Sequence, residues 1–255
     1  MNKQNLVIIH SFPSNSLLLQ GLYTFLSDFF TVYPIDLPGF ISQKKRLKKI
    51  SFEGYVNHIQ KELNTLSLDS YILGGVSFGF SVVNGCQVDD RCKGFLALAP
   101  FINRHYIRDD TYSYDFLKKL LRFVTTLRLH KPVYHARYFK RFLHKQAPPK
   151  HVRLMQENID PYTFFETAKM LIKYRKEPVF HNKPYVLVIN EEDTTISAPK
   201  TIKLFEKLDN VLIVKTTSEH HPGEISKEYF KQHIKPSDIM QLVHFLESQS
   251  SLANC

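Results

Sequence analysis

The pentapeptide at positions 75–79, Gly-Val-Ser-Phe-Gly, is the feature that most constrains the fold of this chain. It directly follows the run Tyr-Ile-Leu-Gly at 71–74 and precedes a helix-like stretch at 80–86. A serine in so sharp a strand-to-helix turn has a strained backbone, and the flanking glycines let the strand and the helix approach closely. The sequence therefore predicts a buried strand, a tight turn and a helix, with the Ser77 hydroxyl held above the sheet.

Two further predicted strands end in polar segments. Residues 184–189 are mostly apolar and predict a buried strand that runs into the acidic turn 190–193, Asn-Glu-Glu-Asp. Residues 211–214 predict another strand, which is followed by the segment 219–224 with its two adjacent histidines. A serine, an aspartate and a histidine therefore follow one another along the chain, each after a predicted strand.

This order resembles that of the α/β-hydrolases, in particular the lid-bearing, esterase-like members. Four more stretches carry the resemblance. Residues 10–13, His-Ser-Phe-Pro, resemble the family's His-Gly-x-Pro, and residues 36–41, Asp-Leu-Pro-Gly-Phe-Ile, resemble its Asp-Leu-Pro-Gly-Phe-Gly. Residues 190–193, Asn-Glu-Glu-Asp, resemble its Gly-x-x-Asp, and residues 220–222 match its His-x-Pro. The resemblance covers about residues 5–100 and 183–250. It implies an α/β-hydrolase fold with a mostly parallel sheet of about six strands, flanked by helices, and a helical lid inserted at 101–180.

The resemblance assigns roles to three residues. Ser77 is the expected nucleophile, which needs a base because a serine hydroxyl is weakly nucleophilic alone. His220 is the expected base, and Asp193 is expected to orient its imidazole and stabilise the charged form. Adjacent residues remain alternatives for two of these roles: Glu191 and Glu192 for the acid, and His221 for the base.

The resemblance also implies an oxyanion hole formed by the backbone N–H groups of Phe12 and Phe78, whereas His10 is expected to support the loop. Four positions depart from the family pattern, where glycine is usual or frequent: Ser11, Ile41, Phe80 and Asn190. Ser11 bears most on function, because the loss of one oxyanion donor costs roughly 2.7–4 kcal/mol of transition-state stabilisation.

The strand at 31–35 is expected at an edge of the sheet. Pro34 lies inside it, and proline has no N–H to donate to a neighbouring strand. Amphipathic helices are expected over 14–30 and 52–66, a helix over 200–208, and a last helix capped by Ser237.

Residues 101–180 hold 17 Lys and Arg against 7 Asp and Glu, whereas the rest of the chain holds 17 of each. The net charge of +10 is therefore confined to the expected lid. Three helices are predicted there, over 112–129, 133–145 and 161–176. The excess of positive charge favours an acidic partner, such as an acidic carrier protein, rather than a particular fold.

No cofactor or metal is expected. The three cysteines, Cys86, Cys92 and Cys255, have no metal-ligand spacing, and no histidine pair has the H-E-x-x-H spacing. The cysteine number also favours a reducing compartment, and no signal-peptide segment or membrane-length apolar run is present, so a cytoplasmic protein is expected. The basic run 44–49 is interpreted as a solvated loop rather than a nuclear signal or phosphate patch, because it follows the Asp-Leu-Pro-Gly loop. No nucleic-acid partner is expected, because no recognition motif accompanies the positive charge.

The expected activity is that of a serine esterase or thioesterase that acts on a small-molecule acyl substrate, including an acidic or carrier-bound one. Size and motifs are similar to those of the esterases that cleave pimeloyl-carrier-protein methyl ester. Two alternatives remain open: a C–C hydrolase or lyase that uses the same three residues, and a binding protein whose site has degenerated.

Overall fold

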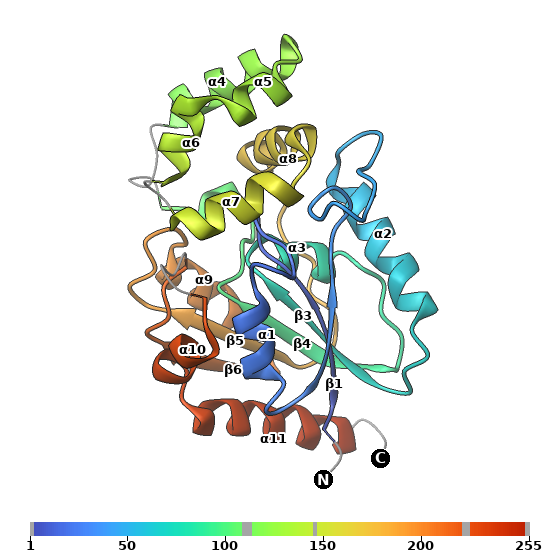
Figure 1. Ribbon diagram of the computed structural model, residues 1–255. Coiled ribbons are helices and arrows are strands. Elements are labelled where there is room, and N and C mark those ends of the chain that lie inside the picture. The colour runs from blue at the N-terminus through green and yellow to red at the C-terminus, as the bar shows by residue number, and fades with distance from the viewer. Residues whose placement is uncertain (1–2, 109–113, 145–146, 221–224, 253–255) are drawn as a thin grey trace.

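The computed structural model describes residues 3–108, 114–144, 147–220 and 225–252, and its centre is one six-stranded sheet (Figure 1). The strands are β1 (Asn5–Ile9), β2 (Thr31–Ile35), β3 (Tyr71–Val76), β4 (Cys92–Leu98), β5 (Tyr185–Asn190) and β6 (Val211–Thr216). Their order across the sheet is β2-β1-β3-β4-β5-β6, and every neighbouring pair is parallel. The predicted six-stranded parallel sheet is confirmed.

Strand β2 lies at one edge of the sheet, as Pro34 predicts. Pro34 is paired in register with Ile8 of β1, its only neighbouring strand. Proline cannot donate a backbone hydrogen bond to a neighbouring strand, and an edge strand tolerates this because one of its sides has no neighbouring strand.

Helices cover both faces of the sheet, because side chains of each strand alternate between two apolar clusters. In β1, Val7 and Ile9 face one cluster, while Leu6 and Ile8 face the other. The first cluster is covered by α2 (Phe52–Thr65), α3 (Phe78–Asn84) and α9 (Ala198–Phe205), and the second by α1 (Gln20–Leu26), α10 (Lys227–His233) and α11 (Pro236–Leu252).

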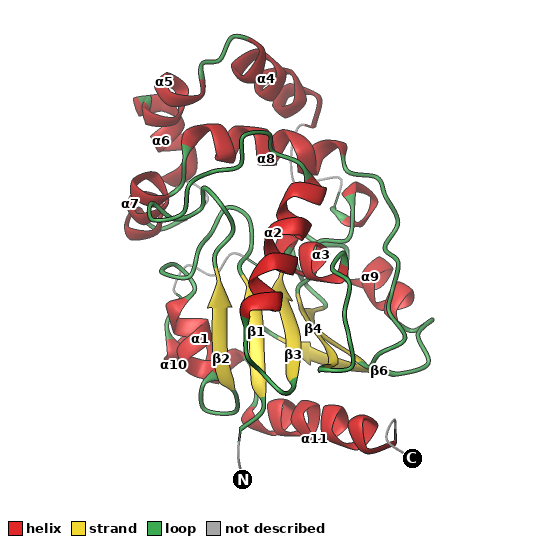
Figure 2. Cartoon of the chain, turned by 90° about the vertical axis from the view of Figure 1, so that its right-hand side faces the viewer, coloured by secondary structure: helices red, strands yellow, loops and turns green. Residues whose placement is uncertain are grey.

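The segment between β4 and β5, which we call the insert (residues 101–180), lies beyond the carboxyl ends of the strands (Figure 2). Its elements are η1 (Arg104–Tyr106), α4 (Tyr114–Thr126), α5 (His130–His135), α6 (Arg137–His144), α7 (Pro149–Asn158) and α8 (Pro161–Lys173). Helices α4 and α5 lie farthest from the sheet, at the opposite end of the molecule from the two chain termini (Figure 1).

The insert is attached to the core at the start of α8. Asp160 caps this helix by accepting a hydrogen bond from the Thr163 N–H (2.9 Å), and its own N–H donates to the Gly39 carbonyl (2.8 Å). Arg46, on the loop that follows β2, forms an ion pair with Asp160 (3.6 Å) and lies over the Tyr162 ring (4.2 Å). The loop and the insert are therefore joined by backbone, charge and ring contacts.

The helices differ from the sequence prediction at several places. The predicted helix at 14–30 is helical only over Gln20–Leu26. Ser237 is not a cap, because α11 already begins at Pro236. Helix α7 lies in a stretch of the insert for which no helix is predicted from the sequence. It begins at Pro149, and proline is well tolerated in the first turn of a helix.

The insert holds five α-helices within the described residues, where three were predicted. The predicted helix at 133–145 is divided at Ala136, which has an extended backbone between α5 and α6. Among the described residues, no helix is both long enough and apolar enough to cross a membrane.

We predict that Gly39→Ala weakens the attachment of the insert. Gly39 has φ +82°, and an alanine Cβ would lie 2.2 Å from the Thr163 hydroxyl. The free energy of unfolding should fall by roughly 1–3 kcal/mol, which is the usual cost of such backbone strain in a residue with a side chain. Chemical denaturation followed by circular dichroism measures this change.

Gly54→Ala is the matched control for Gly39→Ala. Gly54 lies in α2, and the closest atom to its added Cβ would be the flexible end of Leu47, at 3.0 Å. Its unfolding free energy should stay within about 1 kcal/mol of wild type, since alanine is favoured over glycine in helices. Equal losses in both variants would contradict the role given to Gly39.

Candidate active site

Ser77 lies in the turn between β3 and α3 with a backbone that residues with side chains seldom adopt. Its φ is 48° and its ψ is −115°. The flanking glycines are required by close backbone approach: a Cβ on Gly75 would lie 2.3 Å from the Phe80 nitrogen, and one on Gly79 would lie 2.5 Å from the His10 carbonyl oxygen. The strand, turn and helix predicted around Ser77 are therefore present, and they place Ser77 at the carboxyl end of β3.

The loops after β5 and β6 bring Asp193 and His220 to the same end of the sheet. The Ser77 hydroxyl oxygen lies 3.2 Å from His220 Nε2, and His220 Nδ1 lies 2.9 Å from an Asp193 carboxylate oxygen. The side chains of His220 and Asp193 are 4% and 1% exposed. Because Nδ1 donates its hydrogen to the carboxylate, Nε2 is left to accept the proton of the hydroxyl.

The Asp193 carboxylate is held by three donors. One oxygen accepts the His220 hydrogen bond, and the other accepts the N–H groups of Thr195 (2.7 Å) and Ile196 (2.8 Å). Burial by itself would raise the pKa of Asp193, but the hydrogen bonds outweigh burial, and the pKa lies below its usual value. Asp193 is therefore ionised at neutral pH, beside the imidazole that it orients.

The structure separates Asp193 from its sequence neighbours. The side chain of Glu191 points to Lys215, with which it forms an exposed ion pair (2.8 Å), and Glu192 is exposed. The competing histidine, His221, lies outside the described residues.

The predicted oxyanion donors belong to two segments that meet beside the turn at Ser77. Phe78 is the first residue of α3, and Phe12 lies on the loop after β1, which α3 approaches at Gly79. Neither N–H has a hydrogen-bond acceptor within the described part of the chain. A helix N-terminus with free N–H groups stabilises negative charge. The two amides are therefore available to a ligand oxygen.

Ser11 does not require the conformation that only glycine adopts readily. Among the described residues, positive φ angles outside glycine occur only at Ser77, Ala99 and Arg128. The Ser11 carbonyl oxygen accepts hydrogen bonds from the Ser14 N–H (3.1 Å) and the His10 ring (2.7 Å). The loop is thus ordered without the glycine that the family pattern has at this position.

His10 is a buried neutral histidine that links this loop to the next. Its Nδ1 donates to the Ser11 carbonyl (2.7 Å), and its Nε2 accepts the Leu37 N–H (3.0 Å). An Nε2 that accepts a hydrogen bond carries no proton. Burial, which outweighs the nearby Asp36 carboxylate, lowers the pKa of His10 accordingly.

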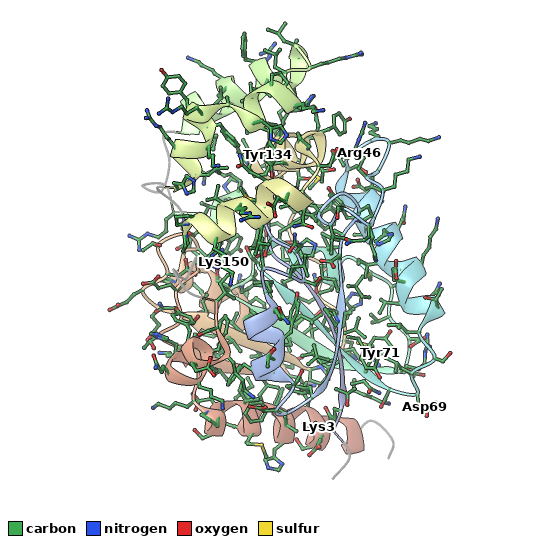
Figure 3. The ribbon with its side chains drawn as sticks, viewed as in Figure 1. Lys3, Arg46, Asp69, Tyr71, Tyr134 and Lys150 are labelled. Atoms are coloured by element: carbon green, nitrogen blue, oxygen red, sulfur yellow. The ribbon has the colours of Figure 1, made fainter. Side chains whose placement is uncertain are left out.

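Aromatic side chains of the insert form a wall against residues 10–14 after β1, which we call the oxyanion loop after the role expected for it from the sequence. The Phe12 ring packs against Phe164 of α8 (5.3 Å between centroids) and Phe40 (6.1 Å). Phe164 in turn contacts Tyr134, which is fully buried in the insert (Figure 3), and Phe139. No sequence motif marks these residues, because each contact joins segments far apart in the chain.

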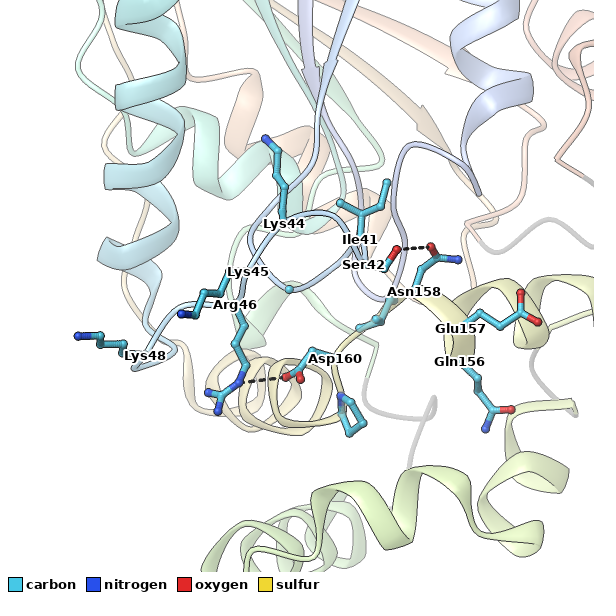
Figure 4. Close-up of a pocket in the computed structure, with 13 residues that line it drawn as sticks. Ile41, Ser42, Lys44, Lys45, Arg46, Lys48, Gln156, Glu157, Asn158 and Asp160 are labelled. Atoms are coloured by element: carbon cyan, nitrogen blue, oxygen red, sulfur yellow. Dashed lines mark hydrogen bonds and ion pairs between the residues drawn. The ribbon is translucent and has the colours of Figure 1, made fainter.

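A separate cleft of about 640 Å³ lies between the loop after β2 and the junction of α7 and α8 (Figure 4). One wall carries Lys44, Lys45, Arg46 and Lys48, and the other carries Gln156, Glu157, Asn158 and Asp160. Arg46 and Lys44 form ion pairs with Asp160 and Glu62, whereas Lys45 and Lys48 form none with any described residue. None of the three clustered residues, Ser77, Asp193 and His220, lines this cleft. Among the described residues, no group of three or more His, Cys, Asp or Glu side chains could hold a metal.

We predict that the neutral His10 makes stability depend on pH. In the unfolded chain a histidine binds a proton below about pH 6.5, whereas buried His10 resists protonation. The free energy of unfolding should therefore fall as the pH drops below about 6.5, by at most about 1.4 kcal/mol per pH unit.

In His10→Gln this part of the pH dependence should disappear, because glutamine can accept the Leu37 N–H without titrating. Denaturant unfolding at a series of pH values measures the difference. His244→Gln, at a side chain 65% exposed on α11, is the matched control and should keep the wild-type profile. An unchanged profile in His10→Gln would argue against a neutral His10.

Neither protein-family models nor curated proteins give a match to this sequence. Solved structures do. A hydrolase from Oleispira antarctica has a TM-score of 0.67 at 16% identity and matches over 97% of this chain and 92% of its own. A thermophilic esterase from Thermogutta terrifontis has a TM-score of 0.65 at 14% identity and matches over 98% of this chain and 91% of its own. An epoxide hydrolase from Bacillus megaterium has a TM-score of 0.63 at 13% identity and matches over 97% of this chain and 95% of its own. With the six-stranded parallel sheet and the strand-end position of Ser77, these likenesses show that the chain has the α/β-hydrolase fold.

Proposed function

We propose that this protein is a serine hydrolase that cleaves a carboxylic ester or thioester through an acyl-enzyme. The observation that carries the proposal is the continuous series of contacts from the Ser77 hydroxyl through His220 to the buried Asp193 carboxylate. Solvent-exposed serines lack such a series, and it is the arrangement that activates a hydroxyl for nucleophilic attack.

The geometry supports a two-step reaction. His220 Nε2 takes the proton as Ser77 Oγ attacks the acyl carbon, and the N–H groups of Phe12 and Phe78 hold the developing oxyanion. His220 then gives the proton to the leaving alcohol or thiol. In the second step a water molecule, deprotonated by His220, attacks the acyl-enzyme. The bond from the acyl carbon to Ser77 Oγ then breaks, His220 returns the proton to Ser77 Oγ, and the carboxylic acid leaves.

The insert is the proposed lid, with residues 1–100 and 181–255 as the core. Its aromatic wall, formed by Phe164 and its neighbours beside Phe12, suits an apolar acyl chain. The cleft with Lys45 and Lys48 suits an anionic part of the substrate, such as a carboxylate, a phosphate or an acidic carrier. The free buried thiols of Cys86 and Cys92 agree with a reducing, cytoplasmic location.

A second enzyme class remains a candidate. The solved structures similar to this chain include MenH from S. aureus and an E-2-(acetamidomethylene)succinate hydrolase, with TM-scores of 0.60 and 0.62. The same three residues could serve C–C cleavage or elimination, with the Ser77 hydroxyl as a base or donor. A panel of ester, thioester and C–C substrates separates the two classes. A catalytically degenerate binding protein is the third candidate, and covalent labelling tests it.

We predict that a fluorophosphonate forms one covalent adduct with the wild-type protein and none with Ser77→Ala. The reagent phosphonylates only a serine whose proton a base can remove. Intact mass spectrometry counts the adducts. Ser237→Ala, at an exposed serine on α11, is the matched control and should label like wild type. A folded wild-type protein that stays unlabelled would favour the binding-protein alternative.

We predict that Asp193→Asn lowers kcat on the best ester by on the order of 10⁴, because the imidazole loses its preferred tautomer and the carboxylate that stabilises its charged form. Stopped or continuous ester hydrolysis measures kcat. Glu191→Gln is the matched control, since Glu191 forms only an exposed ion pair with Lys215. It should stay within about twofold of wild type. Equal effects of the two changes would contradict the role given to Asp193.

A further inference from the structure

The outer part of the insert, residues 117–144 of helices α4 to α6, has an unusual charge. We call it the outer layer. It contains eight Lys and Arg and no Asp or Glu. All eight are exposed, and none forms an ion pair within the described residues. They are Lys118, Lys119, Arg122, Arg128, Lys131, Arg137, Lys140 and Arg141.

Large apolar side chains are exposed on the same layer. Seven are exposed in the described part of the chain, and four of them lie here. Their exposed fractions are 56% for Phe123, 54% for Leu127, 82% for Tyr138 and 44% for Phe142. Phe123 and Leu127 are four residues apart, and so are Tyr138 and Phe142. The Leu127 N–H donates a hydrogen bond to the Phe123 carbonyl (3.0 Å). Tyr138 and Phe142 therefore project from one side of α6, and Phe123 and Leu127 share one side at the end of α4.

The inner side of these helices explains why the apolar side chains remain outside. In α4, Leu121 and Val124 are buried against the core of the insert, so Phe123 lies on the opposite face with Lys119. In α6, Leu143 is buried, and Phe139 joins the aromatic wall through Phe164 (5.7 Å). The buried faces are already filled, and the exposed aromatic residues have no place in them.

We infer that the outer layer binds the surface of an anionic lipid bilayer. Helices that lie in a membrane interface typically carry Lys and Arg beside aromatic and leucine side chains. The outer layer has this composition, and its helices lie at one end of the molecule (Figure 1). The cations are attracted to anionic headgroups, and the apolar side chains enter the boundary with the acyl chains. An acidic protein would match the charge, but it would also have to present an apolar surface to both exposed pairs, whereas a bilayer supplies charge and apolar depth together.

A cleft beside the outer layer suits a lipid phosphate. It has a volume of about 280 Å³ and lies between α4 and α8. Its polar lining comprises Lys118, Arg122, Thr125, Thr126, Lys169 and Lys173. Glu166 engages Lys169 (2.7 Å), whereas Lys118, Arg122 and Lys173 form no ion pair within the described residues. Cations and hydroxyl donors around one small cleft are a suitable environment for a phosphate group.

Sedimentation with lipid vesicles tests the inference. The wild-type protein should sediment with vesicles of phosphatidylcholine and phosphatidylglycerol in equal parts, weakly with phosphatidylcholine alone, and less as salt is raised. Lys140→Glu/Arg141→Glu should weaken the binding by about tenfold or more, because each cation near an anionic surface contributes about fivefold. Lys203→Glu/Lys207→Glu, on and just after α9, makes the same charge change elsewhere and should have a much smaller effect.

The chain contains no tryptophan, which allows a direct test of insertion. Phe123→Trp and Val179→Trp each introduce a single tryptophan at an exposed position, the first inside the outer layer and the second outside it. With the anionic vesicles, the emission of Phe123→Trp should shift to the blue and be quenched by brominated lipid. The emission of Val179→Trp should stay as in buffer.

Three results would overturn the inference: no sedimentation with the anionic vesicles, binding that is unaffected by Lys140→Glu/Arg141→Glu, or equal shifts from both tryptophan positions. The first result would leave an acidic protein as the occupant of the surface. Binding to vesicles does not depend on the proposed hydrolase, so Ser77→Ala should bind as wild type does. Failure of the labelling experiment and failure of this one are therefore distinguishable.

Discussion

Close backbone approach at the turn around Ser77 is the constraint on which the rest of the site depends. Gly75 allows the first turn of α3 to pack closely against the end of β3, and Gly79 allows α3 to contact the end of β1. The Ser77 N–H donates to the Leu98 carbonyl on the neighbouring strand (2.9 Å), which fixes the strained turn from a second side. A larger residue at either glycine would separate the elements, and the Ser77 side chain would lose its position at the carboxyl end of β3.

The polar groups at the strand ends are each held in one protonation state by their partners. Backbone N–H groups and His220 keep the Asp193 carboxylate ionised despite its burial. The Leu37 N–H and the Ser11 carbonyl keep His10 neutral and tie the oxyanion loop to the loop after β2. Buried polar groups with all partners satisfied stiffen a site, whereas unsatisfied ones would destabilise it. The two residues therefore have different electrostatic states: Asp193 is held negatively charged, whereas His10 is held neutral and links two loops by hydrogen bonds.

The insert has two faces with different chemistry. Its inner face packs Phe164 against Phe12, beside the oxyanion loop, and its attachment runs through Asp160 and Arg46. Its outer layer is basic and keeps large apolar side chains exposed.

The sequence by itself determined the individual strands and the strand, turn and helix around Ser77, because each depends on residues a few positions apart, and Pro34 indicated an edge strand. The order of the strands in the sheet followed from the resemblance to a known fold. The sequence also put Asp193 and His220 at strand ends, which is where parallel strands gather side chains. Only the tertiary structure decided which neighbouring acid meets the histidine, and that Phe164 lies against the oxyanion loop. The same holds for the exposure of Tyr138. A helical period shows which residues share a face, but whether that face is covered depends on segments far away in the chain.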